Sequence, residues 1–216
     1  MIVIGAKGFA KELLEDLVSI KYGYNETNLF FFDDVSNNLP QKLFGKYLIL
    51  TTFDEVKKIF NTVSNEFSIG IGSPKHRKFL SKKFEKIGGE LTKVISNSAT
   101  IGSFGNQIEN GVVIMGGNQI TNNIKIGKGT LINLNCTIGH DTVIGEFVEI
   151  TPGVNISGNC SIGDYTTIGT GVKIIPNIKI GQNCIVGAGT VVTKDFPDNS
   201  VIVGVPGKII KQNVPL

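Results

Sequence analysis

The sequence predicts an α/β domain followed by an all-β domain, and two observations carry this prediction. The chain of 216 residues has 27 glycines, of which 8 lie in residues 1–93 and 19 in residues 94–216. Phenylalanine is distributed the opposite way, with 10 of the 13 residues before position 94. The second observation is an aliphatic residue that recurs at every sixth position of the glycine-rich part. We therefore expect one domain at 1–93 and another at 94–216.

The composition excludes several classes of protein. A hydrophobic fraction of 41% is too high for a disordered chain. No apolar run reaches the roughly 18 to 20 residues of a membrane span, and the N-terminus lacks the basic region and cleavage site of a secretory signal. Three cysteines without close spacing argue against a disulfide scaffold or a metal site, and a net charge of +3 argues against a nucleic-acid partner. We expect a cytoplasmic protein without a metal.

The aliphatic repeat runs without a break over 15 positions, which are Ile108, Ile114, Ile120, Ile126, Ile132, Ile138, Ile144, Ile150, Ile156, Ile162, Ile168, Ile174, Ile180, Val186 and Val192. A period of six fits neither an α-helix nor a simple hairpin. It fits a β-solenoid with a triangular cross-section, in which each unit forms one flat side and one corner. Three units make a coil, so the repeat predicts about five coils.

Two other positions of each six-residue unit have a regular composition. Glycine often follows the aliphatic residue, as at Gly139, and we expect it at the corner, where the chain bends and a side chain would clash. A small or β-branched residue follows four positions after the aliphatic one and points inward. Cys136, Cys160 and Cys184 occupy this position on different sides of the prism, so we interpret them as inert core residues.

The N-terminal domain opens with a strand at Met1–Ile4, a turn at residues 5–8 and an apolar-periodic segment that ends near Ile20. Strand, glycine turn and helix are typical of nucleotide-binding α/β folds, in which the bare amides of the turn face a phosphate. Gly8 is therefore a candidate ligand contact. A tight turn that binds nothing is the alternative.

Two more predicted strands end in candidate binding residues. The strand at residues 29–32 ends in Asp33 and Asp34, which either contact a ribose or base or lie in a solvated turn. The strand at residues 67–71 ends at Gly72 and leads into a basic helix at 75–86. We interpret that helix mainly as a solvated face, on which Arg77 is the best candidate for a ligand contact. We interpret His76 as a surface residue.

His140 is the histidine with a chemical context, since Asp141 follows it and both lie at an outward-facing corner. Gly158 returns to the same corner one coil later, and Thr170 and Ala188 form another outward column. Imidazole can act as a general base, a carboxylate can hold its tautomer, and a backbone N–H can stabilise an oxyanion. The arrangement predicts acyl transfer, directly from donor to acceptor because the stack carries no serine or cysteine nucleophile. The alternative is a surface histidine on a structural prism.

Several segments resemble the bacterial nucleotide-sugar and sialic acid acetyltransferases, which join an N-terminal Rossmann-like domain to a left-handed parallel β-helix. They are GAKGFAKEL, FFFDD, IGIGSPKHRK, NLNCTIGHDTVIGEF and VIVGVPGKII. The resemblance covers essentially the whole chain. It implies that His140 is the catalytic base and that Asp141 raises its basicity. It further implies an acceptor contact at Asn133, acetyl-CoA contacts at Gly158, Thr170 and Ala188, and a nucleotide site at Gly8, Asp33, Asp34 and Gly72.

The resemblance implies an acetyl-CoA-dependent N-acetyltransferase, acting on a UDP-linked 4-amino-4,6-dideoxy sugar for a surface glycan. It also implies a homotrimer with CoA between neighbouring prisms. Phe9 and Ala10 replace a histidine and glycine of the family motif, and Glu149 stands where relatives have a second histidine. These departures concern the acceptor sugar more than the acetyl-transfer chemistry. Three alternatives stay open: O-acetylation of sialic acid or another sugar, a longer acyl-CoA donor, and a non-catalytic scaffold that binds nucleotide sugars.

Overall fold

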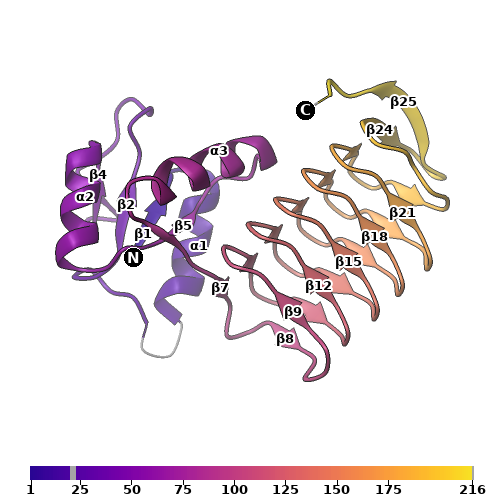
Figure 1. Cartoon of the computed structure of the whole chain (residues 1–216), viewed down its shortest axis with the longest axis horizontal. Coiled ribbons are helices and arrows are strands. Elements are labelled where there is room, and N and C mark those ends of the chain that lie inside the picture. The colour runs from indigo at the N-terminus through magenta and orange to yellow at the C-terminus, as the bar shows by residue number, and fades with distance from the viewer. Residues whose placement is uncertain (20–22, 216) are drawn as a thin grey trace. The chain divides into compact units, whose positions relative to one another are not determined.

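The structure, a computed structural model, describes residues 1–19 and 23–215 (Figure 1). The chain divides into two compact units, residues 1–97 and residues 98–216. The boundary lies a few residues beyond the change in composition because residues 94–97 belong with the first unit. There the side-chain amide of Asn97 donates a hydrogen bond of 2.5 Å to the carbonyl oxygen of Ser19, at the end of the first helix. The predicted helix end at Ile20 lies outside the described residues.

The first unit is a Rossmann-like α/β fold. Its sheet has the order β3-β4-β2-β1-β5-β6, in which β3 pairs antiparallel with β4 and the other pairs are parallel. The strands are β1 (Ile2–Ile4), β2 (Phe30–Phe32), β3 (Lys42–Leu43), β4 (Tyr47–Leu50), β5 (Glu66–Ile69) and β6 (Glu90–Leu91). The helices are α1 (Gly8–Ser19), α2 (Phe53–Thr62) and α3 (Pro74–Glu85).

Aromatic side chains form much of the core of this unit, which accounts for the phenylalanines before residue 94. Phe84 of α3 lies with its ring centroid 5.2 Å from that of Phe32 and 5.5 Å from that of Phe67. The strands and helices predicted around the glycine turn, Asp33 and Gly72 are confirmed. The sequence-based prediction omitted β3, β4 and α2, although α2 begins with a capping box in which Thr52 and Glu55 bond to each other's backbone N–H.

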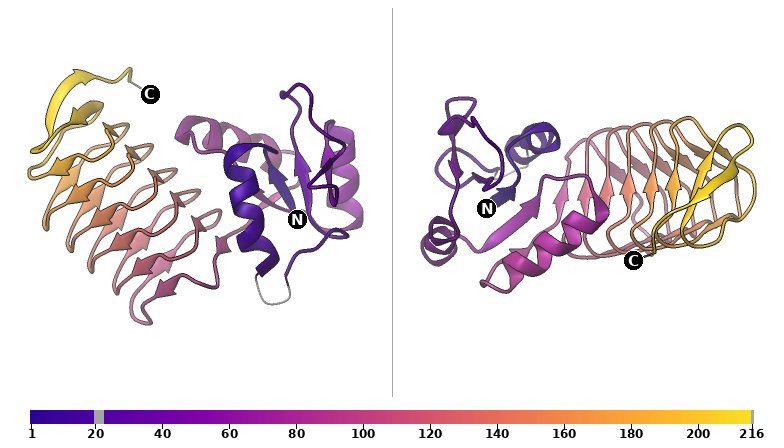
Figure 2. Two further views of the ribbon diagram at one scale, coloured as in Figure 1. Left: turned by 180° about the vertical axis from the view of Figure 1, so that it is seen from behind. Right: turned by 90° about the horizontal axis from the view of Figure 1, so that it is seen from above.

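The second unit is a left-handed parallel β-helix, whose coils follow one another along one axis (Figure 2). Each coil contributes one two-residue strand to each of three faces, and strands of successive coils pair in parallel, as Ile138 pairs with Ile156. The first face contains β8 (Thr100–Ile101), β11 (Gln119–Ile120), β14 (Thr137–Ile138), β17 (Asn155–Ile156), β20 (Lys173–Ile174) and β23 (Val191–Val192).

The second face contains β9 (Gln107–Ile108), β12 (Lys125–Ile126), β15 (Val143–Ile144), β18 (Ser161–Ile162) and β21 (Lys179–Ile180). The third contains β10 (Val113–Ile114), β13 (Leu131–Ile132), β16 (Glu149–Ile150), β19 (Thr167–Ile168), β22 (Ile185–Val186) and β24 (Ser200–Val203), which pairs antiparallel with β25 (Lys208–Gln212). β7 (Val94–Ile95) belongs to the first unit. The strands β9 to β23 are the 15 predicted repeats, so the five coils are confirmed.

The inward positions are occupied as predicted. The aliphatic residues from Ile114 to Val192 are buried, while Ile108 is half-buried in the first coil. Cys136, Cys160 and Cys184 are free thiols inside the prism, beneath three different faces. Burial raises the pKa of each thiol, because an apolar interior disfavours the thiolate. The cysteines are therefore protonated core residues at neutral pH.

The corners differ from the prediction in where the chain bends. The left-handed backbone conformation falls three residues after the aliphatic residue, for example at Asn123, Asp141 and Asn159, with φ of 58°, 59° and 58°. The glycine directly after the aliphatic residue is needed for another reason. A Cβ atom on Gly139 would lie 2.5 Å from the backbone nitrogen of Gly158 in the next coil. Close stacking of the coils, and not the bend, excludes a side chain there.

Candidate functional site

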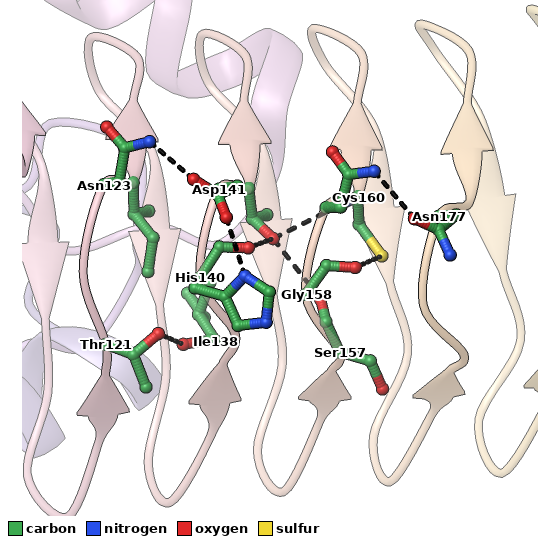
Figure 3. Close-up of polar contacts among 12 residues, drawn as sticks. Thr121, Asn123, Ile138, His140, Asp141, Ser157, Gly158, Cys160 and Asn177 are labelled. Carbon is green, nitrogen blue, oxygen red and sulfur yellow. Dashed lines mark hydrogen bonds and ion pairs between the residues drawn. The ribbon is translucent and has the colours of Figure 1, made fainter.

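His140 and Asp141 form a hydrogen-bonded pair at the corner between the first and second faces. His140 follows β14, and its Nδ1 lies 2.7 Å from Oδ2 of Asp141 (Figure 3). The side chains are 70% and 49% exposed, so both are accessible from solvent. Asp141 occupies the left-handed corner position itself, a conformation that aspartate tolerates better than most residues. The predicted outward direction of this pair is confirmed.

Asn123, one coil earlier at the same corner, holds the second oxygen of the carboxylate. Its side-chain amide donates a hydrogen bond of 2.5 Å to Oδ1 of Asp141. This hydrogen bond, together with that to His140, lowers the pKa of Asp141. Asp141 is therefore a carboxylate at neutral pH and uses one oxygen for each neighbour. The sequence analysis missed Asn123, although its spacing of 18 residues from Asp141 carries the signal.

Gly158 lies directly beside the imidazole ring. A Cβ atom at this position would be 2.6 Å from Nε2 and 2.7 Å from Cε1 of His140, so only glycine leaves the ring where it is. The carbonyl oxygen of His140 accepts a hydrogen bond of 2.7 Å from the backbone N–H of Asn159. Within residues 1–19 and 23–215, the structure shows no acceptor for the N–H of Gly158 and no partner for Nε2 of His140. Both groups are available to a bound molecule.

The other predicted residues of this unit lie at a different corner. Thr170 and Ala188 are exposed and lie between the third and first faces, because they follow β19 and β22. Asn133 follows β13 at that same corner, and its Oδ1 accepts a hydrogen bond of 2.7 Å from the backbone N–H of Leu134. The structure thus brings His140, Asp141 and Gly158 together and places Asn133, Thr170 and Ala188 along another edge of the prism.

The first unit contains a pocket of about 270 Å³ at the carboxyl ends of β1 and β2. Open α/β sheets bind ligands at this edge, where the chain switches from one side of the first strand to the other. Here the chain passes from β4 to β5 across β1. The lining is mostly apolar and includes, among others, Phe32, Asp33, Asp34 and His76. Oδ1 of Asp33 accepts hydrogen bonds from the N–H groups of Val35 and Ser36, at 3.2 and 2.9 Å.

Predictions for three residues near this pocket need adjustment. His76 is exposed, as predicted, but also lines the pocket. Arg77 is only 2% exposed and donates a hydrogen bond to the carbonyl oxygen of Gly72, so its expected ligand contact is wrong. The helix periodicity already indicates this burial, because Arg77 shares one face of α3 with the buried residues Pro74, Ser81 and Phe84. Gly72 is not among the pocket-lining residues.

Gly8 also lies outside the lining of the pocket, at the first residue of α1. It has a φ of 34°, and a Cβ atom there would meet open space. Its glycine is thus explained by backbone conformation and not by crowding. Over the described ranges, no helix is long and apolar enough to cross a membrane, and no group of three or more candidate ligands could hold a metal ion.

Comparison with known proteins identifies the family. Residues 159–194 match the model of the bacterial transferase hexapeptide (six repeats). The structure of WeeI from Acinetobacter baumannii AYE is 31% identical, with a TM-score of 0.86 over 97% of this chain and 98% of that one. The acetyltransferase domain of PglB from Neisseria gonorrhoeae FA1090, in complex with acetyl coenzyme A, is 25% identical with a TM-score of 0.80, over 97% and 98% of the two chains.

A further similar structure is that of a perosamine N-acetyltransferase from Caulobacter crescentus, a histidine-to-asparagine variant in complex with CoA and GDP-perosamine. It is 26% identical, with a TM-score of 0.88 over 98% of this chain and 96% of that one. The likeness therefore covers both units and extends to the sequence. The chain belongs to the bacterial nucleotide-sugar acetyltransferases that combine a Rossmann-like domain with a hexapeptide-repeat β-helix.

Proposed function

We propose that this protein transfers the acetyl group of acetyl-CoA to the amino group of a nucleotide-linked 4-amino-4,6-dideoxy sugar, with His140 as general base. The sugar carries UDP and is destined for a surface glycan, and the enzyme acts in the cytoplasm. The observation that carries the proposal is the His140–Asp141 pair, whose Nδ1 is engaged at 2.7 Å while Nε2 faces Gly158 without a partner among the described residues. The N-acetyltransferase from Caulobacter crescentus supports the substrate class.

The geometry suits a direct transfer. When Nδ1 carries the proton and donates a hydrogen bond to Asp141, the lone pair of Nε2 can accept a proton from the attacking amine. As the amine nitrogen bonds to the thioester carbonyl carbon, the free N–H of Gly158 can donate to the developing oxyanion. The carbon–sulfur bond then breaks, and the CoA thiolate leaves and takes up the proton held by the imidazolium. The buried, protonated cysteines are not available to form an acyl-enzyme.

The remaining predicted residues are assigned to binding. Asp33 and Asp34 hold the nucleotide in the pocket of the first unit, with Gly8 at the start of α1 and Gly72 in the loop before α3 completing the nucleotide site. Thr170 and Ala188 contact CoA through their backbone, and Asn133 lies near the acceptor. Because Thr170 and Ala188 lie on another edge of the prism than His140, we propose a homotrimer in which neighbouring prisms complete each site.

The test is an acetyl-CoA release assay with UDP- and GDP-linked 4-amino-4,6-dideoxy sugars, free sialic acid, and a longer acyl-CoA as an alternative donor. We expect turnover with the UDP-linked amino sugar. His140→Asn should lower kcat by about 10²- to 10⁴-fold, with the fold intact by circular dichroism. Unchanged turnover of this variant would overturn the base assignment. Activity on free sialic acid alone would reject the proposed acceptor, and activity on the GDP-linked sugar alone would correct the nucleotide.

A further inference from the structure

We propose that Asn123 is a positioning residue, which fixes the tautomer and orientation of His140 through Asp141. The inference rests on the proposed role of His140 as the base. Asn123 does not touch His140. Its Nδ2 donates to Oδ1 of Asp141 at 2.5 Å, and Oδ2 of the same carboxylate lies 2.7 Å from Nδ1 of His140 (Figure 3). The three side chains thus form a continuous hydrogen-bonded chain across two coils of the prism.

The contact belongs to a ladder of side chains along one corner. Asn123, Asp141, Asn159 and Asn177 occupy equivalent left-handed positions in four successive coils. The amide of Asn159 donates to Oδ1 of Asn177 at 2.7 Å, in the same way that Asn123 donates to Asp141. The two rungs differ in the acceptor. A carboxylate in place of an amide leaves a second acceptor oxygen, and that oxygen meets the imidazole. The dyad is a modified rung of an asparagine ladder.

An exposed pair needs such a support. The carboxylate of Asp141 is about half exposed, so water competes for both of its oxygens and its final torsion is soft. The amide of Asn123 occupies Oδ1 and leaves Oδ2 for Nδ1–H of the ring. Neutral imidazole carries its proton on one nitrogen, and the hydrogen bond made by that nitrogen decides which one. By fixing Oδ2, Asn123 keeps the proton on Nδ1 and the lone pair on Nε2, beside Gly158.

Replacement of Asn123 by glycine tests this without a change in backbone. Gly105 occupies the same corner column with a φ of 70°, so glycine fits the conformation. Asn177→Gly is the matched control, since it removes the other rung from an exposed position of the same column. The readout is two-bond ¹⁵N–¹H NMR of the full-length, histidine-labelled protein, which reports the tautomer. The chain has 2 histidines, so the spectrum contains one further ring, His76, as an internal reference.

We expect the Nδ1-protonated form of His140 in the wild type and in Asn177→Gly. In Asn123→Gly the ring should shift toward the Nε2-protonated form that free imidazole favours. Its kcat should fall roughly tenfold with little change in KM, as for loss of an outer hydrogen-bond partner of a histidine. Asn123→Asp keeps the shape of the side chain but replaces the amide donor with a carboxylate. We expect this variant to lose the Nδ1-protonated form of His140 and to lose activity as well.

Three results would overturn the inference: an unchanged tautomer in Asn123→Gly, an equal effect in Asn177→Gly, or an unchanged tautomer in Asn123→Asp. The first would show that Asp141 holds the ring unaided. The second would indicate a general weakening of the ladder. The NMR measurement needs no substrate, so it is separate from the proposed function. If His140→Asn retains turnover while Asn123→Gly still changes the tautomer, the base role fails and the positioning role stands.

Discussion

Asp141 shows how an exposed carboxylate can stay ionised well below neutral pH. Two hydrogen bonds, from Asn123 and His140, lower its pKa below the ordinary value of about 3.9 for an aspartate. Since the folded-state pKa is depressed, these interactions persist as the pH falls from neutral to about 4 and disappear only when the pH passes through the depressed value. Asp141 therefore keeps its negative charge at every pH from about 5 upward.

This leads to a prediction for the pH dependence of the reaction. Protonation of Asp141 should make no contribution to the pH dependence of kcat/KM above about pH 5, because its lowered pKa keeps the carboxylate ionised there. Asp141→Asn should lower kcat about a hundredfold while the protein stays folded, since asparagine fits this corner and Asn177 shows that it can accept the same hydrogen bond. Steady-state rates measured across this range check both. An additional ionisation above about pH 5 that is lost in Asp141→Asn would contradict the ionised carboxylate.

Gly158 offers a second prediction about a single residue. Gly158→Ala places a Cβ atom 2.6 Å from Nε2 of His140, so the exposed ring must swing away. The backbone N–H remains, and the φ of Gly158 is not in the left-handed region, so alanine causes no backbone strain. We expect a loss of kcat of about a hundredfold with a thermal midpoint close to that of the wild type. Ser157→Ala, next to it, is the control and should retain its rate.

Among the elements, the inner columns of the prism are stabilised by threonine hydroxyls that bridge successive coils. Oγ1 of Thr166 donates to the carbonyl oxygen of Gly181 at 2.8 Å and accepts from the N–H of Cys184 at 3.0 Å. Thr190 occupies the equivalent position beneath another face and is equally buried. Its hydroxyl has no hydrogen-bond partner within the described ranges. A comparison of Thr166 with Thr190 therefore distinguishes a buried hydroxyl that makes hydrogen bonds from one that makes none.

Valine substitution should distinguish them. Thr166→Val leaves the N–H of Cys184 buried without an acceptor, at a cost of about 1–3 kcal/mol in the free energy of unfolding. Thr190→Val removes a hydroxyl that already lacks a partner, so we expect a stability equal to or above that of the wild type. Guanidinium unfolding curves of the two variants give the comparison. Equal losses would show that side-chain shape, and not the hydrogen bond, stabilises these columns.

The elements of the prism were far more predictable than those of the first unit. Each aliphatic residue from Ile114 to Val192 is buried for the same reason, so one period predicts 14 strands at once. The strands of the first unit are each a separate case. The hairpin of β3 and β4 has no repeated pattern, and α2 is short, with a capping box and an apolar face at Val56 and Phe60 as its signals. Single weak signals of this kind are easily passed over.

The residues of the candidate site inside the repeat were also more predictable than those outside it. His140, Asp141 and Gly158 were brought together correctly because a fixed coil length converts sequence spacing into distance. Asn123 could have been found by the same count. The burial of Arg77 also follows from spacing, since Pro74, Ser81 and Phe84 share its helix face. Its hydrogen bond to the carbonyl oxygen of Gly72 could not be predicted, since it depends on how the loop before α3 is placed. Spacing predicts position inside a repeat, whereas contacts between irregular segments need the three-dimensional structure.

At the scale of the whole molecule, the proposed trimer makes a prediction about mass. Light scattering of the purified protein should give three times the 23.2 kDa of one chain. Because the edge with Thr170 and Ala188 is separate from that with His140, mixing inactive His140→Asn chains with chains altered at Ala188 should restore part of the activity in mixed trimers. A fully active monomer would contradict a shared site.

The constant coil height spaces equivalent positions evenly along each corner of the prism. Successive coils are separated by about 4.8 Å, so each corner carries marks at equal intervals. His140 lies at one such position, Gly158 at the equivalent position of the next coil, and Asn122 at that of the coil before. A histidine and aspartate placed at Asn122 and Asn123, with glycine at position 140 to leave room for the ring, would move the reactive nitrogen by one coil. The position of the catalytic base along the prism can therefore change only in steps of one coil, according to the coil that carries the histidine.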